Sequence, residues 1–134
     1  MIDKIQPGLT HEITHQVEEK HLASHWGSGL AEVLATPVVV AFCEECARLT
    51  VEDLLPPGKG TVGSAINVRH LAPTPPGMRV TAKARLLEVD GRRLRFSVQV
   101  WDQVEQVAEG EHDRFIIDND RFQRGVTAKA HRLA

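Results

Sequence analysis

The chain has 134 residues and a formal net charge of −2 at pH 7, from 16 lysine and arginine residues against 18 aspartate and glutamate residues. Hydrophobic residues make up 42% and charged residues 25%, which suits one folded domain over residues 1–134 and excludes disorder and a strongly basic nucleic-acid-binding surface. No apolar run approaches the ~20 residues of a membrane span, and two cysteines are too few for a secreted disulfide scaffold. We therefore expect a cytoplasmic protein without nucleic-acid or membrane partners.

Residues 9–17 alternate between apolar and polar side chains, which predicts an N-terminal strand. Within them, His11-Glu12-Ile13-Thr14-His15 spells H-E-x-x-H, a zinc-site motif that works only on a helix, where residues four apart share a face. On a strand the two histidines would lie roughly 13 Å apart and could not bind one metal ion. We therefore favour a surface strand over a metal site.

The clearest helix begins at Thr36-Pro37, with Thr36 as a candidate N-cap, and continues over residues 38–55 until Pro56-Pro57-Gly58 stops it. Residues 38–43 are apolar on every side, which predicts that this half is buried all round. Cys43 and Cys46 form a C-x-x-C pair, but they lie two turns into the helix and no second pair exists. Buried thiols are therefore favoured over a redox or zinc site.

After the helix, the alternation has a period of two in residues 61–71, 78–86, 93–100 and 107–117, which predicts strands, with Asp90-Gly91 marking a hairpin. Antiparallel strands with one apolar face need a cover, and the long helix is the one available. We therefore expect an α+β fold in which a curved antiparallel sheet wraps around one central helix. Residues 18–35 give no definite assignment, and the tail after Arg121 is either a short helix or frayed.

Basic residues line the polar face of the expected hairpin, at positions 79, 83, 85, 93 and 95. A solvated sheet face explains them, and a surface that binds a phosphorylated ligand is the alternative.

Three further features are poorly explained by packing alone. Glu44 follows an apolar helical stretch, where an unpartnered carboxylate is costly. His70 ends a predicted strand just before a proline-rich turn, and Gly63 lies among small residues that let a ligand approach the backbone closely. A cap at Thr36, a turn histidine and a β-bulge are the structural alternatives.

Together these features resemble the hotdog-fold acyl-CoA thioesterases, and most closely the fluoroacetyl-CoA thioesterase-like branch. The segments that carry the resemblance are Leu34-Ala35-Thr36-Pro37 with Glu44, Gly60-Thr61-Val62-Gly63-Ser64-Ala65-Ile66-Asn67-Val68-Arg69-His70, Thr74-Pro75-Pro76-Gly77, Asp90-Gly91-Arg92-Arg93-Leu94 and Gly110-Glu111-His112-Asp113-Arg114. It covers nearly the whole chain and is strongest over residues 34–114.

The resemblance implies a catalytic set of Thr36, Glu44 and His70, with a backbone amide near Gly63 as the oxyanion donor. It also implies an acyl-CoA substrate, coenzyme A only as part of that substrate, and no metal. The fluoroacetyl enzymes look as if they carry a phenylalanine of a hydrophobic lid six residues before the threonine; here that place is Leu30. The hydrolytic machinery is therefore implied more firmly than fluoroacetyl selectivity.

Thioester hydrolysis needs a base or nucleophile at the carbonyl carbon and a donor for the oxyanion. Glu44 in an apolar surround would suit the first task, as nucleophile or as general base, and His70 could orient or protonate the departing thiolate. Thr36 and Glu44 are eight helical residues apart, about 12 Å along the axis, so one chain does not readily bring them together. We therefore predict a homodimer with sheets joined edge to edge and sites at the interface, with a tetramer as the larger alternative.

Two other functions stay open from the sequence. A hotdog hydratase or dehydratase would act on a similar thioester with an Asp/His pair, and a non-catalytic acyl-CoA-binding module would keep the pocket without turnover.

Overall fold

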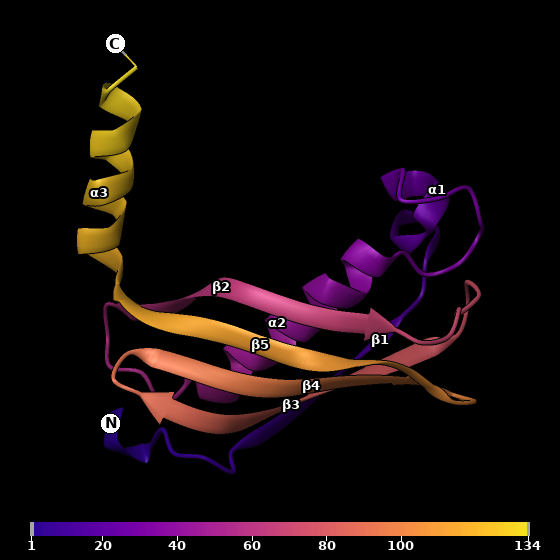
Figure 1. The fold of residues 1–134 in the computed structure, drawn as a ribbon, viewed down its shortest axis with the longest axis horizontal. Helices are drawn as coiled ribbons and strands as arrows, with labels where there is room; N and C mark the ends of the chain where they lie inside the picture. The colour runs from indigo at the N-terminus through magenta and orange to yellow at the C-terminus, as the bar shows by residue number, and fades with distance from the viewer. Residues whose placement is uncertain (1, 134) are drawn as a thin grey trace.

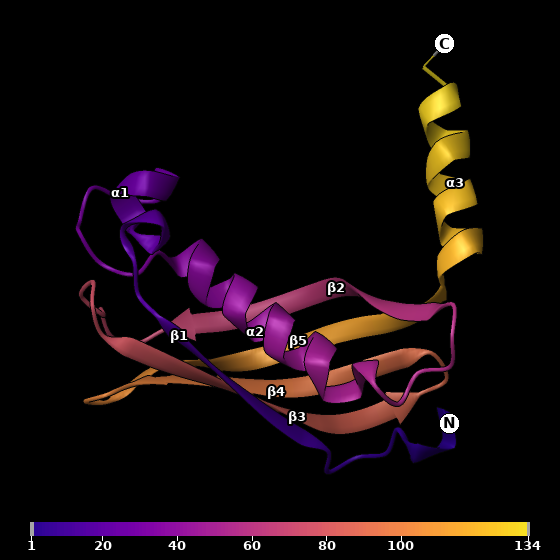
Figure 2. The same cartoon turned by 180° about the vertical axis from the view of Figure 1, so that it is seen from behind.

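The computed structural model describes residues 2–133 and contains one antiparallel five-stranded sheet in the order β1-β3-β4-β5-β2 (Figure 1). The strands are β1 Thr10–Gln16, β2 Lys59–His70, β3 Arg79–Asp90, β4 Arg93–Asp102 and β5 Gln106–Asp118. The helix α2, Thr36–Glu52, crosses one face of the sheet, as both views show (Figures 1 and 2). This is the predicted hotdog arrangement, and it is confirmed.

Alternation in the sequence builds the core between α2 and the sheet. Alternate residues of β3 and β4 point toward α2 and are buried: Val80, Ala82, Ala84, Leu86, Leu94, Phe96, Val98 and Val100. The residues between them face the other side of the sheet. Asp90 pairs with Arg93, so the hairpin loop is Gly91-Arg92, one residue later than the sequence signal suggested, and Gly91 adopts a positive φ of 60°.

The beginning of α2 differs from the sequence-based prediction. Thr36 is the first helical residue, the N-cap is Ala35, and no side chain caps this end. The prediction of Thr36 as N-cap was therefore wrong, because its hydroxyl is bonded elsewhere. The prediction of an all-round buried first half was wrong too: Ala41 is exposed and Val40 only half-buried, since the sheet covers just one side of the helix.

The end of α2 and the C-terminal tail also have new boundaries. α2 ends at Glu52, three residues before the predicted end. The tail forms a regular helix, α3, Asn119–His131, whose first turn is capped by Asp118 through the Arg121 amide. α3 projects away from the sheet at the end where β5 finishes (Figures 1 and 2).

Short helical turns fill the segment that gave no assignment. They are η2 Glu19–His21 and α1 Ala23–Trp26, while a further short turn, η1 Ile2–Lys4, precedes β1. Leu22 and Leu34 form an isolated bridge around α1 and are both buried, so this segment is anchored to the core at its two ends. Among residues 2–133, no helix is long and apolar enough to cross a membrane.

The sheet leaves two edges, β1 and β2, and β2 is the longer, with 12 residues. A register shift between Gly63 and Ala65 marks a β-bulge that leaves Ser64 as an extra residue. An open strand of this length presents unpaired backbone groups along its outer side, which a partner strand can bind.

Candidate active site

Thr36 and His70, 34 residues apart in sequence, meet at one end of the sheet. Thr36 is held by the first turn of α2, and His70 is the last residue of β2. The Thr36 Oγ1 and His70 Nδ1 atoms lie 2.7 Å apart, a hydrogen-bond distance at which a proton can be shared between hydroxyl and imidazole. Because the Thr36 side chain does not cap the helix, its hydroxyl is available for this bond.

The other ring nitrogen of His70 is the unusual atom of the pair. Nε2 is buried and has no hydrogen-bond partner among the described residues. Burial lowers the pKa of His70, so the ring is neutral near pH 7. A neutral ring whose Nδ1 accepts from the Thr36 hydroxyl carries its proton on Nε2.

A pocket of about 360 Å³ lies beside this pair. It is lined by Thr36, His70 and Leu71 and by small and apolar residues of the segment from α1 to α2, including Gly29 and Val33. Leu30, the predicted lid position, lies in the same segment and is 92% exposed, and it does not line the pocket in a single chain.

Glu44 and Gly63 form a second group further along the sheet. Glu44 is half-buried on α2, and its Oε2 lies 3.1 Å from the point that a Cβ on Gly63 would occupy. The same point lies 3.1 Å from His112 Cε1 and 3.5 Å from Arg114 Nη1. The expected apolar surround of Glu44 is therefore wrong: the carboxylate faces a glycine, an imidazole and a guanidinium.

One chain does not bring these two groups together. Seven residues of extended strand separate Gly63 from His70, roughly 23 Å, and eight helical residues separate Thr36 from Glu44, about 12 Å. The structure contains no hydrogen bond between Thr36 and Glu44 among the interactions it describes. The four predicted site residues thus fall into two pairs, Thr36 with His70 and Glu44 with Gly63.

His112 and Arg114 on β5 belong to the Glu44 group, and the sequence analysis gave them no role. Both are buried, with 2% and 5% of their surface exposed. His112 Nδ1 lies 2.8 Å from the Ala65 carbonyl oxygen, so Nδ1 carries the proton and Nε2 accepts from Arg114 Nη1 at 3.2 Å. A usable signal was present, because alternation along β5 places both residues on the same face as the buried Ile116.

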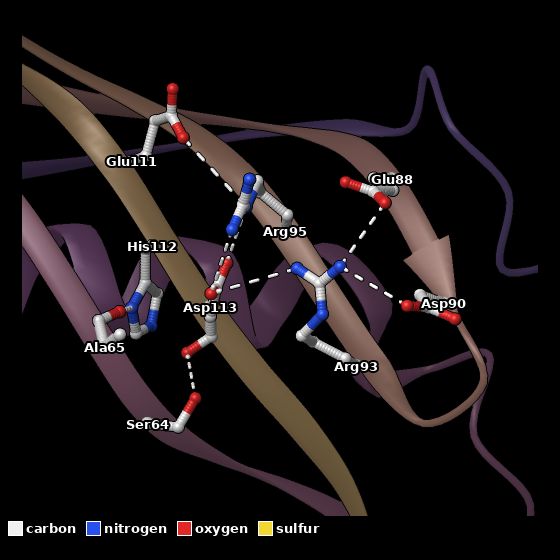
Figure 3. A network of polar contacts seen from close by, with 9 residues as sticks. All are labelled: Ser64, Ala65, Glu88, Asp90, Arg93, Arg95, Glu111, His112 and Asp113. Atoms are coloured by element: carbon white, nitrogen blue, oxygen red, sulfur yellow. Dashed lines mark hydrogen bonds and ion pairs between the residues drawn. The ribbon is translucent and has the colours of Figure 1, made fainter.

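The next residue, Asp113, points to the opposite face of the sheet (Figure 3). There its carboxylate accepts from Arg95 Nε at 3.0 Å, which lowers the pKa of Asp113, and it lies 3.9 Å from Arg93 Nη1. Arg93 also pairs with Glu88 and Asp90. Acidic partners thus neutralise Arg93 and Arg95, two of the five basic residues on the polar face of the hairpin. This favours a solvated sheet face over a surface that binds a phosphorylated ligand.

The remaining sequence motifs take structural positions. His11 and His15 lie on β1, as predicted, and His15 Nε2 lies 2.7 Å from Glu45 Oε1. Cys43 and Cys46 are free and buried, and burial raises the pKa of their thiols to about 12 and about 11. Among residues 2–133, no group of three His, Cys, Asp or Glu side chains could hold a metal ion.

Comparison with known proteins adds a family. The model of the fluoroacetyl-CoA-specific thioesterase family, FlK, matches residues 17–120. The fluoroacetyl-CoA thioesterase of Streptantibioticus cattleyicolor is 40% identical over 98 residues, which are 73% of this chain and 70% of that protein.

Solved structures agree with this match. A structure of the fluoroacetyl-CoA thioesterase FlK superposes with a TM-score of 0.89 at 32% identity, covering 95% of this chain and 98% of that one. A thioesterase superfamily member from Thermus thermophilus superposes with a TM-score of 0.90 at 24% identity, covering 96% of both chains, which shows a shared fold.

Proposed function

Because the chain belongs to the fluoroacetyl-CoA-specific thioesterase family, we propose that it hydrolyses a short acyl-CoA thioester to a free acid and coenzyme A at a site shared by two subunits. The observation that carries the proposal is the Thr36–His70 pair, whose Nε2 is buried beside a pocket with no protein partner among the described residues. The FlK structures include a variant in complex with fluoroacetate and CoA.

The proposed partner is a second copy bound along β2. In an antiparallel pair of β2 strands, setting His70 of one chain opposite the partner's Gly63 also sets Gly63 opposite the partner's His70. Two equivalent sites result, each with Thr36 and His70 from one chain and the partner's Glu44 and Gly63. This arrangement supplies a neighbour for the open 12-residue edge and unites the two pairs that one chain keeps apart.

The chemistry follows from the groups that would meet there. The Glu44 carboxylate attacks the thioester carbonyl directly or takes a proton from a water that does so, and the Gly63 amide stabilises the developing oxyanion. His70 Nε2–H donates to the departing sulfur, while the Thr36 hydroxyl fixes the ring orientation. Water is consumed, the C–S bond breaks, and the acid and the thiol are released. No step in this scheme needs a cofactor beyond the CoA part of the substrate.

A thiol-release assay over acetyl-, fluoroacetyl-, propionyl- and longer acyl-CoA thioesters tests the reaction. We expect hydrolysis of the shorter thioesters and its loss in both Glu44→Gln and His70→Ala. Binding without thiol release would instead support an acyl-CoA-binding module. Loss of enoyl absorbance without free thiol would support a hydratase. Running the assay in H₂¹⁸O under single turnover identifies Glu44 as a nucleophile if label enters the protein carboxylate, which general-base catalysis does not allow.

Mixing the two inactive variants tests the shared site. A mixed dimer of Glu44→Gln with His70→Ala contains one intact site, so an equal mixture should regain about a quarter of wild-type activity after subunit exchange. No recovery in an exchanged dimer, or a fully active monomer in sedimentation, would refute the two-chain site.

We further propose a cytoplasmic location, which is supported by the two free, buried cysteines.

A further inference from the structure

The C-terminal helix α3 carries an exposed apolar stripe. Phe122 and Val126 are four residues apart and therefore lie on one face of the helix, and Leu133 continues this face just beyond the helix end. All three side chains are exposed, and none of residues 119–131 is buried. A helix of 13 residues is only marginally stable in water by itself, so a surface that packs against this stripe would stabilise it.

The direction of α3 leads past the edge strand β2. The helix begins where β5 ends, and there the Asn119 amide donates to the Gly58 carbonyl oxygen at 2.9 Å, next to the start of β2. Figures 1 and 2 show α3 standing at a steep angle to the strands and leaving the sheet on its β2 side. Thirteen helical residues span about 20 Å, roughly four strand spacings. The helix is therefore long enough to reach over the first strands of a second sheet joined to β2.

The register of the proposed dimer decides which part of the partner α3 meets. The proposed pairing sets His70 opposite the partner's Gly63. The same antiparallel register sets Lys59 opposite the partner's Thr74, just beyond the end of that β2 strand. Because α3 starts beside Lys59, it meets the partner at the end of the sheet that lies opposite to α3 within one chain (Figure 1).

Two loops form the surface at that end, and we call them the pocket-end loops. They are residues 71–78 after β2 and residues 102–105 between β4 and β5. The loops are neighbours, because the Leu71 amide donates to the carbonyl oxygen of Val107, at the start of β5, at 2.6 Å. Leu71 and Val104 are both exposed, and Leu71 also lines the pocket of the candidate active site. These loops thus offer apolar surface to a helix with an apolar stripe.

Charge favours the same contact. Residues 119–132 contain four lysine and arginine residues and one aspartate. The pocket-end loops contain two acidic residues, Asp102 and Glu105, and no lysine or arginine. Opposite charges would therefore surround an apolar contact, as they do at the rim of many protein interfaces.

We propose that α3 of each subunit packs across the pocket-end loops of a second copy of this chain, with Phe122 and Val126 covering the partner's Leu71 and the partner's Val104. This inference rests on the dimer of the proposed function, because the register of that dimer selects the surface. The two α3 helices lie at opposite ends of such a dimer, so they do not cover each other. Each helix instead adds an outer wall beside the partner's pocket.

Disulfide trapping tests the contact. In a chain that carries Val126→Cys and Val104→Cys, the two new cysteines lie at opposite ends of the sheet and can only join different chains. The native Cys43 and Cys46 are buried, with raised thiol pKa values, and do not compete. After mild oxidation we expect about half of the chains or more to run as a cross-linked dimer on a non-reducing gel. The control is Thr127→Cys with Val104→Cys, whose helical cysteine lies about 100° around α3, and about a tenth of the chains or fewer should cross-link.

The affinity of the dimer gives a second readout. Phe122→Glu with Val126→Glu places two charges in the stripe, while the control, Thr127→Glu with His131→Glu, places two charges at the same spacing on the other side of α3. In sedimentation equilibrium, we expect the dimer Kd to rise about tenfold or more in the first variant and less than about threefold in the control. An unchanged Kd in the first variant, an equal rise in both, or equal cross-linking of the two cysteine pairs would overturn the inference.

The outcomes separate this inference from the proposed function. If the wild type hydrolyses no thioester but the cross-link forms, the proposed function fails and the α3 contact stands. If the wild type is an active dimer and no cross-link forms, only the α3 contact is refuted. A basic amphipathic helix also suits an anionic lipid surface. Wild-type protein that sediments with phosphatidylserine vesicles and forms no cross-link in their absence would therefore overturn the contact in favour of a membrane.

Discussion

Adding one methyl group at Gly63 tests how closely the carboxylate must approach the strand. In Gly63→Ala the new Cβ would lie 3.1 Å from both Glu44 Oε2 and His112 Cε1, closer than ordinary van der Waals contact, so a neighbour must move by a few tenths of an ångström. The His112 ring is fixed by hydrogen bonds at both nitrogens. Glu44 has no such bond among the described interactions, and we expect it to move.

The expected effects on stability and on catalysis differ. Crowding costs about 1 kcal/mol, and replacing a glycine in a strand returns about 0.5–1 kcal/mol, so the free energy of unfolding should change by less than about 1 kcal/mol. Displacing the Glu44 carboxylate from the reacting carbon by up to ~1 Å should lower kcat 10- to 100-fold.

Urea unfolding and steady-state thiol release with acetyl-CoA measure the two quantities. Gly125→Ala is the matched control, because a Cβ there meets nothing within 4 Å and the residue lies in the projecting helix α3. Unchanged kcat in Gly63→Ala would refute the placement of Glu44 against this glycine. A loss of several kcal/mol would show that His112, not Glu44, is forced to move.

Three more predictions concern stability. Gly110→Ala should lower the free energy of unfolding by about 3 kcal/mol or more in urea titrations. Its Cβ would lie 2.8 Å from Val68 Cα and even closer to the Asn67 carbonyl oxygen, and these backbone atoms cannot move aside. A free energy of unfolding within about 1 kcal/mol of wild type would contradict this. Thr74→Val should lower the free energy of unfolding by about 1–2 kcal/mol, because the buried Thr74 hydroxyl donates to Asp102 Oδ2 at 2.9 Å. The same carboxylate accepts from the backbone amides of the β4–β5 turn. An unchanged urea midpoint would count against this prediction. Burial lowers the pKa of three histidines, His21, His70 and His112, below 6.5. The unfolded chain then binds more protons, so stability present above pH 6.5 should be lost as pH falls through the folded pKa values, and a melting temperature that stays flat from pH 7 to 5 would refute this.

The sheet and the long helix followed from periodicity because burial on one face is a strong, repeated constraint. Thr36 shows where such reasoning ends. A threonine before proline has the residue type of an N-cap, and only the folded chain shows that a histidine 34 residues later takes its hydroxyl. Residue preferences describe local interactions only, and here the tertiary hydrogen bond to His70 replaces the local capping bond.

Glu44 and Arg114 show the same limit, because their surroundings depend on residues distant in sequence. Apolar neighbours in sequence suggested an apolar surround for Glu44, but the residues opposite it come from β2 and β5, and their identity depends on strand order and register. Arg114 lies on a strand whose polar residues mostly face solvent. Its alternation with Ile116 indicated an inward position, yet its value as a partner for Glu44 appears only once the sheet is formed.

The core lies within one chain, whereas the proposed site is shared by two chains along the edge strand β2. The core between α2 and the sheet is buried within a single chain, with Phe96 and Val39 fully enclosed. The proposed chemistry does require a partner chain, because Gly63 and His70 lie on one strand at a separation that no side chain spans. In the proposed dimer, a two-fold axis beside β2 brings Gly63 of one chain close to His70 of the other, since each end of the strand meets the other end of its partner. The spacing between Gly63 and His70 therefore sets the strand register of the proposed dimer.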